Sequence, residues 1–309
     1  MLEITIQRIT KFWLHPSIIF NNSSMGKRLH EIMSHFNKIT NEIIKKKKES
    51  MNEDNFTREG KDLHARKNTN PILDALFKSF YETGEYSETD IYNEINTIVI
   101  AGSDTAANTL TYLFLMLATF PDIQKKVYEE LYDMYGSSDP VDVPFTMEDT
   151  KKMKYLERVI KETLRLFPGV PVFGRTLCSD IKGIFTYNEI FFVYSFLLLS
   201  LLFYVVIILF FPIFSLHRKD KYWTDPLKFN PDRFLPGNYN PKCFLPFSFG
   251  KRRCIGQIFA MITIKAIAAT ILRKFAVRID DALSIENINL IFGITLKSAE
   301  PIFLRFNKR

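Results

Sequence analysis

The chain has 309 residues, of which 47% are hydrophobic and 24% are charged, and its formal net charge is +7. This composition supports a hydrophobic core and excludes a largely disordered chain. The moderate positive charge suits an anionic membrane surface or an acidic protein partner. Because no basic stripe with interleaved aromatic residues is present, we expect no nucleic-acid partner.

Helices are predicted through the first third of the chain. Residues 27–48 and 71–81 have helical spacing, and the polar stretch 49–68 between them predicts an exposed connector. Ser87 and Asp90 have the spacing of a capping box, with Asp in place of the usual Glu, and they open a helix at about 88–119. A helix of this length spans about 45 Å, which is enough to cross a whole domain.

Helices and loops alternate through the rest of the chain. The helix at about 154–167 is the most regular, because its apolar residues recur on one face, and Pro168 ends it. The other expected elements are a helix at 121–135, a loop at 136–144, a short helix capped by Thr146 and Asp149, an extended segment at 168–180, a loop at 222–246, a helix at 255–272, and one or two strands at 290–303.

Cysteine and histidine are sparse. The three cysteines form no Cys-x-x-Cys pair and no Cys/His group with zinc spacing, which indicates reduced thiols in a body that faces the cytosol. The start of the chain has neither the charged nor the apolar region of a signal peptide. The histidines also lack ligand spacing, and we interpret them as incidental: His15, His30, His35, His64 and His217.

The most informative stretch runs from Phe247 to Gly256 and reads Phe-Ser-Phe-Gly-Lys-Arg-Arg-Cys-Ile-Gly. It places Cys254 beside three cations and at the start of a helix, a setting that favours the thiolate form that binds metals. Gly250 and Gly256 allow a sharp turn and the close approach of a flat ligand. Arg252 can reach a carboxylate. One thiolate, one arginine and such a surface suit haem iron with an axial cysteine.

A lone cysteine in a basic loop is usually structural, but the pattern Phe-x-x-Gly-x-Arg-x-Cys-x-Gly fixes four positions besides the cysteine. The segment resembles the haem-binding loop of the cytochrome P450 superfamily. The resemblance implies that Cys254 is the axial ligand of the iron and that Arg252 pairs with a haem propionate. Phe247, Gly250 and Gly256 then belong to the cofactor site.

A second constellation lies inside the long helix, at Ala-Gly-Ser-Asp-Thr, residues 101–105. A glycine followed by Asp and Thr is costly in a helix interior. Taken alone, the stretch does not exclude a mildly polar helix face. It resembles the oxygen-activation segment of the same family, which implies that Gly102 makes room for the haem. Thr105 and Asp104 would then handle the oxygen species and the protons.

Glu162 and Arg165 lie three residues apart on a helix face away from the apolar stripe. In isolation they predict a surface ion pair worth a few tenths of a kcal/mol. The run Glu-Thr-Leu-Arg-Leu-Phe-Pro that they begin resembles the family's Glu-x-x-Arg helix, and Asn-Pro-Asp-Arg-Phe-Leu-Pro at 230–236 resembles its meander. The resemblance implies a buried, structural network of Glu162, Arg165 and Arg233. It also implies that Arg175 reaches a propionate and that Gly169 to Phe173 contact substrate.

The four motifs occur in the family's order, and the details are most similar to insect-type microsomal members. The resemblance implies a mainly α fold with minor β, the cytochrome P450 fold without its N-terminal part. It implies a haem monooxygenase that inserts one atom of O₂ into a small hydrophobic substrate, with haem b (iron) as cofactor. Electrons would come from NADPH-cytochrome P450 reductase, so that NADPH acts indirectly. The expected location is the cytosolic face of the endoplasmic reticulum membrane, through an anchor that this chain does not contain.

One segment departs from the family. Residues 184–215 form an apolar insert between a helical part at 1–183 and a part at 216–309 that holds the meander, the cysteine loop, the following helix and the C-terminal strands. Within it, residues 190–214 carry no charge and qualify by length as a transmembrane helix. The family pattern returns at Leu-His-Arg-Lys-Asp-Lys-Tyr-Trp, residues 216–223.

A transmembrane span at 190–214 and haem binding exclude each other, because the span would put the Glu162–Arg165 pair and Cys254 on opposite sides of the bilayer. Two interpretations remain. The insert has the Phe/Leu/Ile/Tyr bias of translated A/T-rich DNA, which suggests a retained intron; or it is a real lipid-facing element. The alternative function is a catalytically inactive fragment that spans the membrane through these residues.

Overall fold

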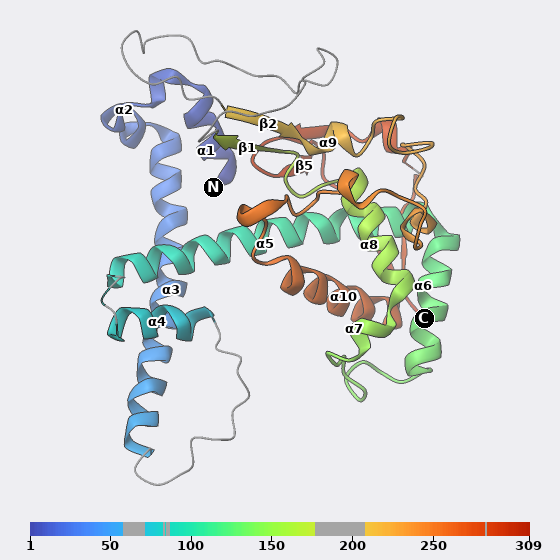
Figure 1. Ribbon diagram of the computed structural model, residues 1–309, viewed down its shortest axis with the longest axis horizontal. Coiled ribbons are helices and arrows are strands. Elements are labelled where there is room, and N and C mark those ends of the chain that lie inside the picture. The colour runs from blue at the N-terminus through green and yellow to red at the C-terminus, as the bar shows by residue number, and fades with distance from the viewer. Residues whose placement is uncertain (58–71, 83, 85–86, 177–207, 282) are drawn as a thin grey trace. The chain divides into compact units, whose positions relative to one another are not determined.

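The computed structural model describes residues 1–57, 72–82, 84, 87–176, 208–281 and 283–309. The described residues are mostly helical with three small antiparallel sheets, which confirms the expected fold class (Figure 1). The chain divides into two compact units, residues 1–103 and 104–309, and one long helix, α5, contributes to both.

The first unit is helical throughout the residues described. Its helices are α1 (Leu2–Thr10), α2 (Ser17–Asn22), α3 (Ser24–Thr57), α4 (Ile72–Glu82) and the first half of α5 (Glu88–Thr119), with a 3-10 turn at Phe12–Leu14. The connector expected at 49–68 was wrong for residues 49–57, which continue α3; its remainder lies outside the described residues. This stretch contains two Glu and one Met, which are good helix formers, and no Pro or Gly interrupts it.

Helix α5 begins at the predicted capping box. The Ser87 N–H donates to Asp90 Oδ2 at 2.8 Å, and the Asp90 N–H donates to Ser87 Oγ at 3.2 Å. These two bonds satisfy backbone donors that the first helical turn leaves without partners. The predicted helix at 88–119 is thereby confirmed.

The second unit contains the remaining helices and all the strands that the structure describes. The helices are α6 (Pro121–Tyr135), α7 (Asp149–Lys152), α8 (Lys154–Leu166), α9 (Ile213–Leu216) and α10 (Gln257–Lys274). Short 3-10 turns occur at Pro231–Phe234, Pro241–Cys243, Gly250–Arg252 and Ile285–Asn287. The antiparallel pairs are β1 (Val172–Thr176) with β2 (Ile208–Pro212), β3 (Phe275–Arg278) with β6 (Arg305–Lys308), and β4 (Leu290–Phe292) with β5 (Leu296–Ser298).

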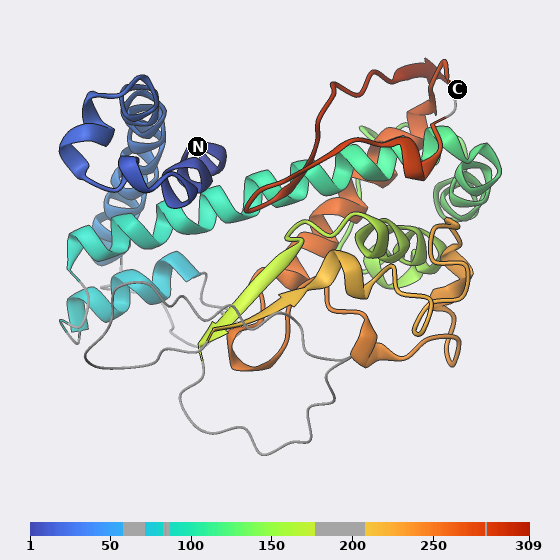
Figure 2. The same cartoon turned by 90° about the horizontal axis from the view of Figure 1, so that it is seen from above.

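The core of this unit forms around the second half of α5. Residues 112–117 are buried at six consecutive positions, so this part of the helix is covered on every side, by α6, α8, α10 and the C-terminal strands (Figure 2). Gln124 joins these layers, because its amide bonds Leu117 O at 2.9 Å and both backbone groups of Val277 at 2.8 Å. A fully bonded buried amide fixes the position of β3 against α5 and α6.

The end of the apolar insert belongs to the folded unit. Residues 208–212 form β2, which pairs with β1 in a register that places Phe211 opposite Phe173, and residues 213–215 lie in α9. Of the insert expected at 184–215, the structure thus describes the last eight residues, which are strand and helix. The span proposed at 190–214 lies outside the described residues up to 207, and its remainder is strand and the start of a short helix. Among the described helices, none combines the length and the apolar character that crossing a membrane requires.

Candidate functional site

Residues 247–256, the cysteine loop, are held in shape by backbone hydrogen bonds. The Cys254 N–H donates to Phe247 O at 2.9 Å, and the Arg253 N–H donates to Gly250 O at 3.2 Å. The loop turns sharply, because Gly250 has a φ of +75°, a conformation that glycine adopts at low cost. The side chain of Cys254 is exposed.

Cys254 precedes the following helix instead of lying in it. Helix α10 begins at Gln257 with Gly256 as its N-cap, two residues later than the predicted start at 255. A β-carbon at Gly256 would lie 3.8 Å from Cys254 Sγ. Glycine at this position therefore leaves one side of the thiol open.

Large apolar side chains are exposed among the five residues that follow Cys254 in the chain. Ile255 is 84% exposed, Ile258 is 76% exposed and Phe259 is 74% exposed. Apolar residues that gather at the surface in this way mark a binding site for an apolar partner. The side chains of Lys251, Arg252 and Arg253 make no ion pair with any other residue that the structure describes.

Arg175 on β1 reaches the cysteine loop. Its Nη2 donates to Ser248 Oγ at 2.7 Å and to the Arg252 carbonyl at 3.5 Å, and its guanidinium lies 4.7 Å from the centre of the Phe173 ring. Phe173 in turn makes an edge contact with Phe249, with ring centroids 5.7 Å apart. The structure thus brings Arg175, Arg252 and Cys254 into one region, although 77 residues separate the two arginines.

The haem that the resemblance implies fits these residues in three respects. The Cys254 thiol is accessible, and the adjoining Ile255, Ile258 and Phe259 offer apolar surface that a flat macrocycle would cover. Arg175 and Arg252 provide cations for the propionates. Among the described residues, no group of three or more Cys, His, Asp or Glu side chains could hold a metal ion.

Asp104 is held by the segment around β5. Thr295 Oγ1 donates to Asp104 Oδ2 at 2.7 Å, and Lys297 Nζ donates to Asp104 Oδ1 at 2.9 Å. Partial burial opposes ionisation, but these hydrogen bonds and the Lys297 charge outweigh it and keep the pKa of Asp104 below its ordinary value. Asp104 is therefore an ionised and paired carboxylate at neutral pH.

Thr105 lies next to the turn that follows α8. A β-carbon at Gly169 would lie 3.6 Å from Thr105 Cβ, and the Leu296 N–H donates to Gly169 O at 3.1 Å. Helix α5, the predicted substrate-contacting turn and β5 therefore meet at one place. Gly102, which the first unit contains, lies where a β-carbon would meet no atom within 4 Å.

Glu162, Arg165 and Arg233 form one buried network. Arg165 donates through Nε to Glu162 Oε2 at 2.7 Å and through Nη2 to Glu162 Oε1 at 2.9 Å, and Arg233 Nε donates to Glu162 Oε1 at 3.3 Å. The side chains of Glu162 and Arg165 are 0% exposed. The surface ion pair that spacing alone predicts is wrong, because the meander covers this face of α8 as well.

Carbonyl oxygens of residues 217–226, which lead into the meander, complete the network. Arg165 Nη1 donates to His217 O and Pro226 O, each at 2.7 Å, and Arg233 donates to Thr224 O and to Asp225 O. The Asn230 N–H adds a bond of 2.8 Å to Glu162 Oε1. Buried charges with this many hydrogen bonds define the path of the chain from His217 to the meander.

His217 was interpreted as incidental, and the structure corrects this. It is 0% exposed, it accepts a hydrogen bond from the Leu245 N–H at 2.9 Å, and its carbonyl oxygen binds Arg165. Thr295 and Lys297, the partners of Asp104, were also missed. The one sequence signal was the position of His217 in the run at 216–223, where the family pattern returns.

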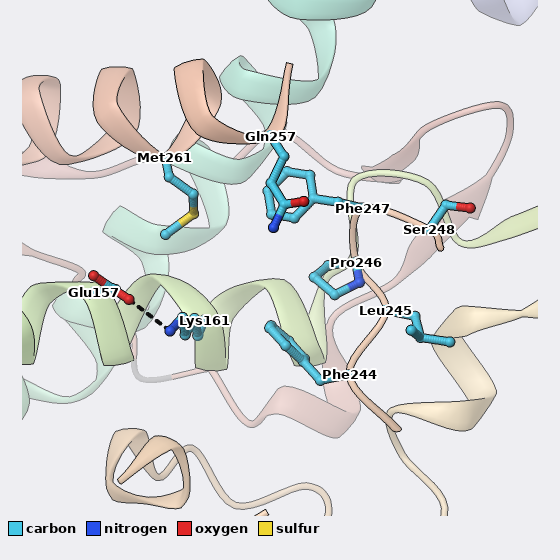
Figure 3. A pocket seen from close by; sticks show the side chains of 9 residues that line it. All are labelled: Glu157, Lys161, Phe244, Leu245, Pro246, Phe247, Ser248, Gln257 and Met261. Carbon is cyan, nitrogen blue, oxygen red and sulfur yellow. Dashed lines mark ion pairs between the residues drawn. The ribbon is translucent and has the colours of Figure 1, made fainter. Parts of the chain in front are cut away.

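A pocket of about 280 Å³ lies between α8, the segment that enters the cysteine loop, and the start of α10 (Figure 3). Its lining consists of Glu157, Lys161, Phe244, Leu245, Pro246, Phe247, Ser248, Gln257 and Met261. Lys161 is paired with Glu157 at 2.7 Å, and Met261 points from α10 toward this pair. Phe247 of the predicted site thus also lines this pocket.

Comparison with known proteins identifies relatives along nearly the whole chain. The sequence model of the family described as Cytochrome P450 matches residues 1–183 and 206–305. The match leaves out 184–205, most of the expected apolar insert. Cytochrome P450 4V2 of Homo sapiens is 33% identical over 315 residues, which cover 100% of this chain and 56% of that protein.

Two insect proteins are also similar to this chain. Cytochrome P450 4c21 of Blattella germanica is 32% identical and covers 90% of this chain and 53% of that protein. Cytochrome P450 4c3 of Drosophila melanogaster is 28% identical, with coverages of 99% and 56%. The chain thus spans about half the length of these relatives. A crystal structure of a cytochrome P450 (CYP102L1) superposes with a TM-score of 0.71 over 95% of this chain and 60% of that one, at 23% identity, which shows the fold.

Proposed function

Because the chain belongs to the cytochrome P450 family, we propose that it is the haem-binding part of a monooxygenase that inserts one atom of O₂ into a small hydrophobic substrate. The observation that carries the proposal is the cysteine loop: an exposed Cys254 thiol bordered by exposed apolar side chains and by arginines. A haem with a cysteine thiolate ligand supplies the activation of O₂ when it is bound.

The residues of the chain have separate roles in this proposal. Cys254 ligates the iron, and Arg175 and Arg252 pair with the propionates. Ile255, Ile258 and Phe259 cover the macrocycle and exclude water from it. Thr105 and the ionised Asp104 hold and pass protons in the middle of α5, beside the turn at Gly169. Glu162, Arg165 and Arg233 keep the meander and the cysteine loop in place.

The partners follow from the chemistry. We propose that electrons come from NADPH through NADPH-cytochrome P450 reductase, and that the exposed cations Lys251 and Arg253 help to dock an acidic face of that enzyme. The proposed location is the cytosolic face of the endoplasmic reticulum membrane, which the resemblance to microsomal members of the family supports.

Haem titration of the 309-residue chain tests the proposal. We expect one haem per chain, with the absorption and magnetic circular dichroism bands of thiolate ligation, and NADPH-dependent transfer of ¹⁸O from ¹⁸O₂ to a fatty acid once reductase is added. Cys254→Ala should lose the thiolate bands and the product, whereas Cys243→Ala, at a buried cysteine outside the loop, should keep both. Thiolate bands that persist in Cys254→Ala would remove the ligand assignment. A chain that takes up no haem would favour the inactive fragment.

We further propose that the insert is a retained intron. The family match that ends at 183 and resumes at 206, together with the pairing of β1 with β2, supports an insertion between elements that belong side by side. Sequencing of full-length transcripts should return forms without these codons. A peptide from residues 184–205 in protein from the source tissue would instead favour a real lipid-facing segment.

A further inference from the structure

His217 occupies the junction between α9 and the meander. It is the C-cap residue of α9, and its N–H donates to Ile213 O at 2.9 Å. The ring packs in an aromatic cluster, nearly parallel to Phe244 with centroids 5.4 Å apart and edge-on to Trp223 at 6.2 Å. A histidine that is fully buried among aromatic rings has its orientation fixed by packing.

His217 accepts two hydrogen bonds, one from each of two separate segments. Its carbonyl oxygen accepts from Arg165 Nη1 at 2.7 Å, and its ring Nε2 accepts from the Leu245 N–H at 2.9 Å. Because Nε2 is an acceptor, the ring is neutral and carries its proton on Nδ1. Burial, and next the charge of Arg165, lower the pKa of His217 to about 3, so this tautomer persists through the physiological range.

Leu245 connects this ring to the cysteine loop. The Leu245 carbonyl accepts from the Ser248 N–H at 3.0 Å, and two residues later the Phe247 carbonyl accepts from the Cys254 N–H at 2.9 Å. Pro246, which lies between them, has no N–H to offer. Figure 3 shows this segment, Phe244 to Ser248, beside α8 and leading into the cysteine loop. The Leu245 N–H is therefore the donor through which the segment is tied to the meander.

We propose that His217 is a positioning residue, which sets the backbone of the cysteine loop through the Leu245 N–H and thereby transmits the geometry of the Glu162–Arg165 pair to Cys254. The proposal rests on the proposed function in that Cys254 is taken as the iron ligand. It assigns His217 no contact with substrate or cofactor. The proposed role requires a hydrogen-bond acceptor at the position of Nε2, on a side chain that fits the space of the imidazole ring.

Two substitutions separate the acceptor from the ring. His217→Phe keeps an aromatic ring for Phe244 and Trp223 but has no acceptor. His217→Gln keeps a carbonyl oxygen that reaches about as far as Nε2 but has no ring. Packing alone would favour Phe, whereas the proposed role requires that Gln be the better replacement.

The first measurement is amide hydrogen exchange on the haem-free chain. Without its acceptor, the buried Leu245 donor loses a bond, so peptides covering 244–256 of His217→Phe should exchange about tenfold faster than in the unchanged chain. Peptides from α6 and from the first turns of α8 should be unchanged, and His217→Gln should stay within about threefold. Exchange in His217→Phe at the unchanged rate would overturn the proposal.

The second measurement is the fraction of thiolate-ligated haem, read from the same spectroscopic bands after loading. We expect a severalfold loss in His217→Phe and its recovery in His217→Gln. A loop that loosens without any loss of thiolate ligation would overturn the link to Cys254. If the unchanged chain takes up no haem, the proposed function fails, while the exchange measurement still decides the role of His217 in the loop.

If a variant does not fold, a measurement on the unchanged chain still tests the proposal. With ¹⁵N-labelled histidine, the proposal requires a neutral ring that is protonated at Nδ1 and whose Nε2 has the shift of a hydrogen-bonded acceptor. A ring protonated at Nε2 would overturn the assignment, because such a ring cannot accept from Leu245.

Discussion

The buried network of Glu162, Arg165 and Arg233 lies in the same unit as the cysteine loop. The two regions differ in how far their functional groups are exposed. The charged groups of the network bond to one another and to carbonyl oxygens, and Glu162 and Arg165 have no exposure. The cysteine loop instead presents a thiol and large apolar side chains at the surface. Substitutions in the network should therefore lower the free energy of unfolding, whereas substitutions in the loop should lower the affinity for haem.

The largest expected effect is that of Glu162→Ala. Removing one partner leaves Arg165 buried without a carboxylate, which costs about 3–5 kcal/mol of the free energy of unfolding. Cys254→Ala, at an exposed position, should change it by less than ~0.5 kcal/mol. Urea unfolding of both variants checks the contrast, and equal losses would break the comparison.

Acid should lower the free energy of unfolding through His217, which binds Arg165 of the network. The folded ring has a pKa of about 3 against an ordinary value of 6.5, so below pH 6.5 the unfolded chain binds a proton that the folded chain does not. Stability should therefore be unaffected above pH 6.5 and fall by up to about 1.4 kcal/mol per pH unit below it.

The window from pH 6.5 to 4.5 isolates this effect of acid. The carboxyl of Glu157, whose pKa its bonds to Lys161 and Lys265 lower to about 2 against the cost of burial, contributes only below its ordinary value of 4.5. Unfolding curves of His217→Gln should lose the slope in this window. A slope equal to that of the unchanged chain would mean that another group is responsible.

Arg233→Lys should have a smaller effect than Glu162→Ala. Lysine cannot reproduce the fork that binds Glu162 and the carbonyl oxygens of Asp225 and Lys228, but Glu162 keeps Arg165. We expect a loss of about 1–3 kcal/mol, measured by urea unfolding. A loss as large as that of Glu162→Ala would show that Arg165 alone cannot neutralise the carboxylate.

The smallest effect on stability is expected in the first turn of α10. The double variant Ile258→Ser and Phe259→Ser should change the free energy of unfolding by about 0.5 kcal/mol or less, because both side chains are already exposed. Haem affinity should fall by at least about tenfold, since two large apolar side chains are lost from the binding surface. Ile267→Ser, at another exposed isoleucine of α10, is the matched control. Haem titration that gives the same affinity for both would place the haem elsewhere.

The helices could be predicted wherever their signals are local. Capping at Ser87 and Asp90, Pro121 at the start of α6, and the periodic apolar face of α8 are all read within a few residues. Strands β3 and β6 were missed because each has four residues and their pairing joins Phe275 to Lys308, far apart in the chain. Because a short strand is not stable by itself, its own few residues do not predict it, and it forms only when its partner strand is in place.

The sequence by itself determined which reactive groups this protein contains: the glycine-bracketed Cys254, the order of its four motifs, and the two helices, α5 and α8, that carry two of these motifs. Tertiary structure alone decided which groups are buried and which meet. It buried Glu162 and Arg165, which their spacing alone would leave on a helix surface. It also paired Asp104 with Lys297 and placed the His217 ring within hydrogen-bond distance of the Leu245 N–H. The reason is that hydrogen bonds and burial between distant segments depend on packing, which local spacing does not encode.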